Sequence, residues 1–346
     1  AFILDREQRT PTARERLLLE RYCGFGGLKC ILNPARELAD AVHWAKSDLE
    51  LFAPTVELHR LIRENSKNES EYKQLMDSLK QSVLTAFYTP SAVTEALTDV
   101  LKEHQIIPEK VLEPSAGIGA FVDSVLDNNP KADIMAFEKD LLTGKILRHL
   151  HPEQKVRIEG FEKIEKPFND YFDLAISNIP FGDVAVFDPS YTAMKGMRAL
   201  VTRRIHNYFF VKALDTVRDG GLVAFITSQG VLNAKNNSAA RFMMLYHADL
   251  VSAIRLPNNL FTENANTEVG SDLIILQKNT QKESLRGDDN LLDTVYNDEN
   301  RIPTNNYFLE HPERIIHTTA KLDTDPFGKP AMIYTHEDGV EGIAED

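Results

Sequence analysis

The sequence of 346 residues predicts an α/β fold, a doubly wound and mostly parallel sheet that follows a helical N-terminal extension. Two observations predict it. Short apolar runs recur from Val111 onward, and most of them are separated by stretches that could form helices, as in parallel sheets that helices bury on both faces. A glycine-rich turn follows the first run, where a strand would lead into a helix.

The first 82 residues are expected to be helical. Apolar and charged residues recur at helical spacing in 14–22 and 56–82, and Pro34 opens a third helical stretch that ends at Trp44, itself an expected core residue. The segment Cys23-Gly-Phe-Gly-Gly27 lies between two of these stretches, and we interpret it as a turn between helices.

The apolar runs define the central domain, for which we take residues 83–279. After Lys278 the sequence turns polar, and we expect residues 280–346 to form an acidic, irregular tail, with 15 acidic and 6 basic side chains. The expected strands contain the runs at 111–112, 134–137, 174–176, 222–226, 250–254 and 273–276.

Composition narrows the classes of function. The apolar runs are far shorter than the roughly 20 residues that span a bilayer, and no basic and apolar leader opens the chain, so we expect no membrane partner and a cytoplasmic location. Cys23 and Cys30 are too few for a disulfide framework or a four-cysteine zinc site, which indicates a reducing compartment and no metal.

The first candidate site is the turn Glu113-Pro-Ser-Ala-Gly-Ile-Gly-Ala-Phe121. Its glycines would let the backbone approach a ligand closely, and the following helix would favour polar or anionic groups at its start. The segment does not continue as Gly-x-Gly-x-x-Gly, because no third glycine follows Gly119 at that spacing, and this disfavours a dinucleotide ligand. Glu138 ends the second expected strand, 19 positions after Gly119, where a carboxylate can accept both ribose hydroxyls. The glycine turn and Glu138 together favour an adenosine-containing ligand. Alone, the turn is compatible with a plain connection between a strand and a helix, and an acidic residue at a strand end is common.

The second candidate site is Asn178-Ile-Pro-Phe181, directly after an apolar strand. Here the chain resembles the amino-group methyltransferases that use S-adenosylmethionine, whose hallmark is Asn-Pro-Pro-(Phe/Tyr). With the glycine turn and Ala86-Phe-Tyr-Thr-Pro90 it is most similar, over about residues 83–279, to the adenine-N6 DNA methyltransferases. The resemblance implies a seven-stranded Rossmann-like methyltransferase sheet whose last two strands pair as an antiparallel hairpin that includes residues 267–278.

The same resemblance implies which residues bind S-adenosylmethionine. The Thr-Pro segment would lie against its methionine end, and Phe161 or Glu162, after the third strand, would lie near its adenine unless they are merely structural. The expected cofactor residues are Tyr88, Thr89, Pro90, Glu113, Pro114, Ser115, Gly117, Gly119, Phe121, Glu138, Phe161 and Glu162.

The catalytic loop is expected to consist of Asn178, Ile179, Pro180 and Phe181. An aromatic exocyclic amine is a poor nucleophile, because its lone pair is delocalised into the ring. The Asn178 side-chain oxygen and the Ile179 carbonyl can accept its two N–H groups and aim the nitrogen at the methyl group. Phe181 can stack on a base turned out of the duplex.

Ile179 departs from the family, which usually has proline there. The carbonyl acceptor remains, but the backbone is less restricted, which predicts a less rigid loop. A similar Asn-Ile-Pro-Phe-Gly sequence occurs in methylase domains of large helicase–methylase proteins of phages and mobile elements. Segments 22–28 and 306–313 also resemble that subgroup, which implies a helicase region in a longer chain. Two alternatives stay open: methylation of RNA or protein amide nitrogen, and a degenerate module that only binds DNA or cofactor.

DNA is the expected partner despite a net charge of -13. Lys195, Arg198, Arg203 and Arg204 lie in a window, 189–214, that contains no acidic residue. These side chains could hold phosphates, or they could belong to a solvated helix face.

Overall fold

The computed structural model describes the whole chain except residues 195, 263–267, 286, 297–301 and 326–327. Its centre is a seven-stranded sheet with the order β3-β2-β1-β4-β5-β7-β6. β7 is antiparallel to β5 and β6, and the other neighbouring pairs are parallel, which confirms the predicted doubly wound, mostly parallel sheet. The strands are β1 (Lys110–Glu113), β2 (Asp133–Phe137), β3 (Lys155–Arg157), β4 (Phe172–Asn178), β5 (Val217–Ser228), β6 (Ala248–Leu256) and β7 (Ser271–Lys278).

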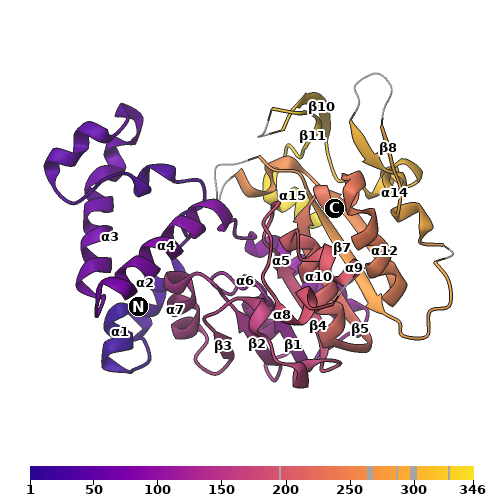
Figure 1. Cartoon of the computed structure of the whole chain (residues 1–346), viewed down its shortest axis with the longest axis horizontal. Coiled ribbons are helices and arrows are strands. Elements are labelled where there is room, and N and C mark those ends of the chain that lie inside the picture. The colour runs from indigo at the N-terminus through magenta and orange to yellow at the C-terminus, as the bar shows by residue number, and fades with distance from the viewer. Residues whose placement is uncertain (195, 263–267, 286, 297–301, 326–327) are drawn as a thin grey trace.

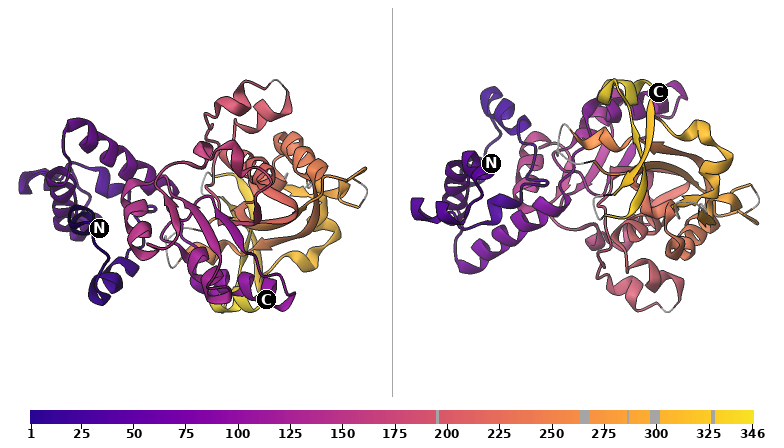
Figure 2. Two further views of the ribbon diagram at one scale, coloured as in Figure 1. Left: turned by 90° about the horizontal axis from the view of Figure 1, so that it is seen from below. Right: turned by 90° about the horizontal axis from the view of Figure 1, so that it is seen from above.

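Helices cover both faces of the sheet (Figures 1 and 2). Adjacent strand residues point to opposite faces, so Leu112 packs in the cluster of α10 and α12 while Val111 packs in the cluster of α5, α6 and α15. Burial on both faces explains why the strands read as continuous apolar runs. These helices are α5 (Ser91–Glu103), α6 (Ala120–Asn128), α10 (Ile205–Thr216), α12 (Ser238–His247) and α15 (Gly339–Glu345), with α7 (Leu141–Leu150) beside β3 and the short α8 (Pro189–Thr192), α9 (Met197–Val201) and α11 (Gly230–Asn233).

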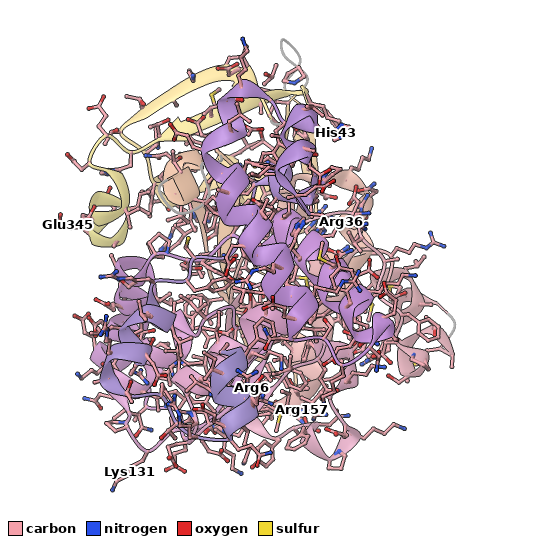
Figure 3. All side chains as sticks on the ribbon, turned by 90° about the vertical axis from the view of Figure 1, so that its left-hand side faces the viewer. Arg6, Arg36, His43, Lys131, Arg157 and Glu345 are labelled. Carbon is pink, nitrogen blue, oxygen red and sulfur yellow. The ribbon has the colours of Figure 1, made fainter. Side chains whose placement is uncertain are left out.

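The N-terminal region lies to one side of the sheet, next to α7, and Figure 3 looks onto it, with Arg6, Arg36 and His43 labelled. It contains α1 (Phe2–Glu7), α2 (Ala13–Glu20), α3 (Phe52–Glu64) and α4 (Glu69–Thr85), with 3-10 helices at Lys29–Leu32, Leu38–His43 and Lys46–Leu51. Its core includes Ile62 and Leu79, and Leu142 of α7 joins that core. The N-terminal region is therefore packed directly onto the sheet domain.

One expected helix of this region is wrong. The stretch from Pro34 forms turns and a 3-10 helix, because the Asp40 carboxylate accepts the backbone N–H groups of Arg36 and Glu37 at 2.7 and 3.3 Å. Such local bonds offer the backbone an alternative to a helix. Trp44 is buried as expected and packs edge-on against Phe52.

The C-terminal segment is not the irregular tail that its composition predicts. Its described residues form two pairs of antiparallel strands and two α-helices, and Val340 and Ile343 of α15 pack into the cluster that contains α5. The buried Arg241 of α12 fixes part of this segment by donating to the Leu292 carbonyl at 2.7 Å. The additional elements are β8 (Thr294–Tyr296), β9 (Pro303–Asn305), α14 (Asn306–Glu310), β10 (Thr319–Thr324) and β11 (Pro330–Thr335).

The two edge strands of the central sheet differ. At one edge β3 has three residues. At the other edge, groups that follow β6 in the chain bind its outer side: the Ile316 N–H donates to the Arg255 carbonyl at 3.0 Å, and Lys282 Nζ donates to the Ala248 carbonyl at 2.8 Å. Among the described residues, no helix is long and apolar enough to cross a membrane.

Candidate active site

The predicted site residues meet at the carboxyl edge of the sheet. Glu113 is the last residue of β1, Glu138 directly follows β2, and Asn178 is the last residue of β4. β1 lies between β2 and β4 with parallel register, so these three strand ends lie side by side. In doubly wound sheets, ligands bind outside the carboxyl ends of the strands.

The glycine turn connects β1 to α6 and contacts two other predicted site residues. Gly117 and Gly119 have φ values of +57° and +99°, which L side chains rarely adopt. The Gly117 N–H donates to Glu138 Oε2 at 2.8 Å, and a Cβ on Gly117 would lie 2.8 Å from Cε1 of Tyr88. The turn, the Glu138 carboxylate and the Tyr88 ring therefore form one contiguous surface.

Several buried polar atoms at this edge lack a hydrogen-bond partner of good geometry among the described residues, among them Oγ1 of Thr89, Oγ of Ser177 and Oε2 of Glu113; the Ser177 hydroxyl lies close enough to Glu113 to oppose the rise of its pKa. Glu113 is 1% exposed and Thr89 is 7% exposed. Leaving a buried polar group unpaired costs free energy, so such atoms need a specific reason. A bound ligand that carries both donors and acceptors would pair them.

Burial raises the pKa of Glu113 to about 8, and burial together with Asp140 raises the pKa of Glu138 to about 8. Three backbone N–H groups, of Gly117, Lys139 and Asp140, oppose this shift at Glu138. Carboxyl groups with raised pKa values are typical of functional sites.

This raised pKa predicts a pH dependence of stability. Between about pH 4.5 and about pH 8 the folded chain retains a proton on Glu113 that the unfolded chain has lost, so the free energy of unfolding falls as pH rises through this window. We expect Glu113→Gln to flatten that slope in urea denaturation, whereas the exposed Glu50→Gln leaves it as in the wild type. An unchanged slope in Glu113→Gln would contradict the assignment.

The predicted catalytic loop, residues 178–181, is held by hydrogen bonds to two backbone carbonyls. Asn178 Nδ2 donates to the Phe87 carbonyl at 2.8 Å, and no described residue donates to Asn178 Oδ1. The backbone N–H of the buried Ile179 donates to the Ile226 carbonyl of β5 at 3.0 Å. The Phe181 ring packs edge-on against Phe261 and stays partly exposed. Pro180 between them is also partly exposed.

The side chains of Phe121 and Phe161 lie in the apolar clusters on opposite faces of the sheet rather than together at its edge. Phe161 is 1% exposed and has aromatic contacts with Phe137 and Phe209. Glu162 is partly exposed, with an oxygen 3.6 Å from Lys139 Nζ. The cofactor roles of Phe121 and Phe161 stay predictions, and the structure shows that both side chains also belong to the apolar core beneath the edge.

The predicted DNA-binding side chains are engaged to different degrees. Arg198 makes two bonds to the Asp215 carboxylate at 2.6 and 2.9 Å, and Arg204 pairs with Asp183 at 2.7 Å. Arg203 is exposed. Lys195 lies outside the described residues. Of this predicted set, Arg203 is the described side chain available to a phosphate without breaking an ion pair inside the chain.

One residue at the site, Thr143, was missed in the sequence. Its hydroxyl lies 3.2 Å from the Tyr88 hydroxyl and 3.1 Å from the Tyr22 hydroxyl. Asp140 caps α7 by accepting the Thr143 N–H, and that Asp-x-x-Thr spacing at a helix start is the signal that could have pointed to it.

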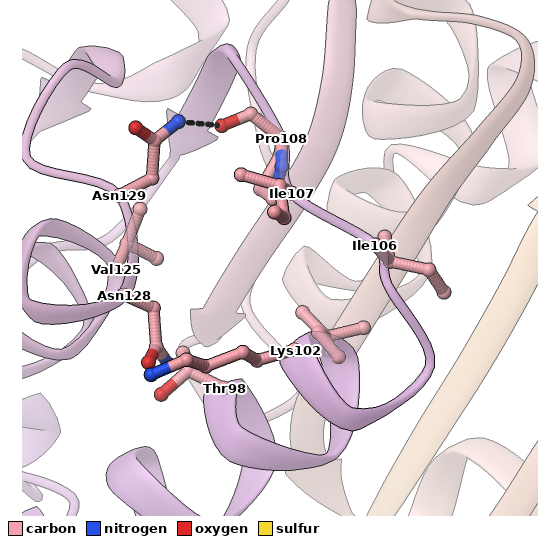
Figure 4. Close-up of a pocket in the computed structure, with 9 residues that line it drawn as sticks. Thr98, Lys102, Ile106, Ile107, Pro108, Val125, Asn128 and Asn129 are labelled. Atoms are coloured by element: carbon pink, nitrogen blue, oxygen red, sulfur yellow. Dashed lines mark hydrogen bonds between the residues drawn. The ribbon is translucent and has the colours of Figure 1, made fainter.

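The cavity in Figure 4 lies near the amino ends of the strands, on the side of the sheet opposite to the predicted site. It is lined by residues of α5, α6 and the segment that precedes β1, and in it Asn129 Nδ2 donates to the Pro108 carbonyl at 2.9 Å. It shares no residue with the predicted site. Over the described ranges, no group of three or more His, Cys, Asp or Glu side chains is placed to hold a metal ion.

Two curated proteins have sequences similar to part of this chain. The defense against restriction protein B of Escherichia phage P1 is 29% identical over 201 residues, 56% of this chain and 8% of that protein. The type II methyltransferase M.XamI of Xanthomonas campestris pv. amaranthicola is 25% identical over 173 residues, 46% of this chain and 33% of that protein. The chain thus spans at most about a third of the length of either relative.

The chain can also be aligned with a crystal structure from Vibrio vulnificus YJ016 that is described as a modification subunit of a putative type I restriction enzyme. It aligns with a TM-score of 0.47 and 15% identity over 84% of this chain and 67% of that chain. The family model described as N-6 DNA Methylase matches residues 70–333, which include every residue of the predicted site. The chain therefore belongs to the N-6 DNA methylase family.

Proposed function

We propose that the chain transfers a methyl group from S-adenosylmethionine to the N6 amine of adenine in DNA, on a base turned out of the duplex. The orientation of Asn178 carries this proposal. Its Nδ2 is bound to the Phe87 carbonyl at 2.8 Å, which leaves Oδ1 as a fixed acceptor at the edge of the sheet. An oxygen to which no described residue donates can accept an N–H group of the amine.

Ile179 and Phe181, which follow Asn178 in the loop, would supply the other contacts that this reaction requires. The Ile179 carbonyl supplies a second acceptor, so the two N–H groups of the amine can be held and its lone pair can be directed at the methyl group. Phe181, partly exposed, offers a ring on which an extrahelical base can stack. Orientation of the two reactants would supply much of the rate.

S-adenosylmethionine is the methyl donor of this family, and its sulfonium supplies an electrophilic methyl group when it is bound. The unpaired oxygens of Thr89 and Glu113 fit its amino-acid end, which carries both a donor and an acceptor group. Glu138, whose two oxygens also accept the N–H groups of Gly117 and Asp140, would accept from the ribose hydroxyls. Gly117 and Gly119 lack the side chains that would block a close approach of the ligand to the turn.

The structure of the loop favours an active enzyme over a degenerate binding module. Ile179 lacks the rigid ring of proline, but its N–H extends the β4–β5 ladder through the bond to Ile226. Proline could not donate this bond. The hydrogen bond to Ile226 therefore restrains the loop at the position where the family's proline ring would do so.

The test is transfer of tritium from labelled S-adenosylmethionine to unmethylated genomic DNA, RNA and protein in parallel, followed by nucleoside analysis of the DNA. N6-methyladenosine in the DNA digest is the expected product. Label in RNA or protein alone would overturn the choice of substrate, and cofactor binding without any label would favour the degenerate module.

A helicase region in the same protein and a cytoplasmic location stay predictions.

A further inference from the structure

The glycine loop of the N-terminal region, residues 24–27, lies against the Thr-Pro segment of the sheet domain. Gly24 has a φ of +74°, and a Cβ there would lie 2.9 Å from Cε2 of Tyr88. A Cβ on Gly26 would lie 2.0 Å from the Ala86 carbonyl oxygen, a distance that no side chain tolerates. The Gly27 N–H donates to the Val83 carbonyl at 2.9 Å. This close approach, rather than a simple turn between helices, requires the glycines.

The other side of the Tyr88 ring faces the cofactor turn. A Cβ on Gly117 would lie 2.8 Å from Cε1 of Tyr88, so the ring lies between two backbone segments that both lack side chains. Gly24 comes from the N-terminal region and Gly117 comes from the turn after β1. A displacement of the glycine loop would therefore move the Tyr88 ring against the turn after β1.

A third restraint fixes the hydroxyl end of the ring. The hydroxyls of Tyr22 and Tyr88 both lie within hydrogen-bond distance of Oγ1 of Thr143, which is 1% exposed. The Tyr22 ring also packs edge-on against Phe25 of the glycine loop. The Tyr88 ring is therefore restrained on its Cε2 and Cε1 sides and at its hydroxyl.

We propose that the glycine loop is part of the cofactor site: it presses Tyr88 against Gly117 and so sets the affinity for S-adenosylmethionine. The inference rests on the proposed function. Thr89, the neighbour of Tyr88, gives independent support for a ligand here. Its side chain is more than nine-tenths buried, and its hydroxyl has no hydrogen-bond partner among the described residues. The loop lies outside residues 70–333, which the family model matches.

Gly24→Ala tests the proposal, with Gly287→Ala as its matched control. Both glycines have positive φ, but a Cβ on Gly287 meets nothing within 4 Å, whereas a Cβ on Gly24 meets Tyr88. We expect calorimetry to give an about tenfold higher Kd for S-adenosylmethionine in Gly24→Ala, because the site loses preorganisation. The Gly287→Ala Kd should match the wild type. In kinetics, KM for the cofactor should rise in Gly24→Ala while KM for DNA stays constant.

Tyr88→Phe keeps the test decisive if Gly24→Ala fails to fold. It removes the hydroxyl bond to Thr143 without adding volume, and an about threefold to tenfold weaker cofactor binding is expected. Wild-type affinity in a folded Gly24→Ala or in Tyr88→Phe would overturn the role of the glycine loop and leave the proposed function standing. A wild-type chain that binds no S-adenosylmethionine would overturn both.

Discussion

Asn178→Ala is expected to lower the rate of methyl transfer about 10²–10³-fold, by analogy with the removal of one preorganised hydrogen-bonding group from other active sites. The variant removes the acceptor Oδ1 and the bond from Nδ2 to the Phe87 carbonyl. Cofactor affinity should change less than the rate, because the predicted cofactor contacts lie on the turn after β1, on Glu138 and on the Thr-Pro segment, and among the described residues of these parts the Asn178 side chain is bound only to the Phe87 carbonyl. The effect therefore belongs in kcat rather than in the Kd for S-adenosylmethionine.

The measurement combines single-turnover tritium transfer with calorimetry of S-adenosylmethionine binding. Asn129→Ala is the matched control, because its Nδ2 also donates to a backbone carbonyl, that of Pro108, but at the opposite edge of the sheet. We expect that control to transfer methyl groups at the wild-type rate. Substantial transfer by Asn178→Ala would remove Asn178 from the mechanism.

Asp272→Ala is expected to lower the free energy of unfolding by about 3–5 kcal/mol, because it leaves a buried guanidinium without its counter-ion. Arg255 and Asp272 side chains are 3% and 0% exposed, and their closest N–O distance is 3.0 Å. Burial raises the pKa of Asp272, while Arg255 opposes that shift. Arg255 would retain the Asn233 oxygen and the face of Phe308, and neither carries a negative charge.

Urea denaturation of Asp272→Ala and Asp133→Ala measures this difference. Asp133 pairs with Lys155 at 2.7 Å, but both side chains are about half exposed, so that pair should contribute about 0–1 kcal/mol. Similar small losses in both variants would show that solvent reaches the Arg255–Asp272 pair.

The strands of the sheet could be predicted because burial on both faces leaves a continuous apolar run, as in residues 221–227 of β5. The order of the Thr-Pro segment, the glycine turn and Asn178 also located the site, since strand ends converge at one edge. β3 gave little signal, because Lys155 and Arg157 flank its one apolar residue and the strand is not fully buried.

The features that the sequence did not indicate depend on contacts between distant parts of the chain. The glycine loop reads as a turn until Tyr88, more than 60 positions later, is seen against it. The polar composition of residues 280–346 predicts disorder, but the backbone pairs locally in β10 and β11 and needs few buried side chains to do so. Residues 267 and 195, for which roles were predicted, lie outside the described residues.

The bonds along the outer side of β6 have a consequence for self-association. An uncovered edge strand offers a row of unpaired N–H and C=O groups to any passing strand, and so invites aggregation. Here Lys282 and Ile316 bind that row from within the same chain, and the charged β3 at the far edge is too short to serve as a template. The acidic C-terminal segment therefore occupies both ends of this edge of the central sheet, which disfavours edge-to-edge pairing of β6 with a second copy.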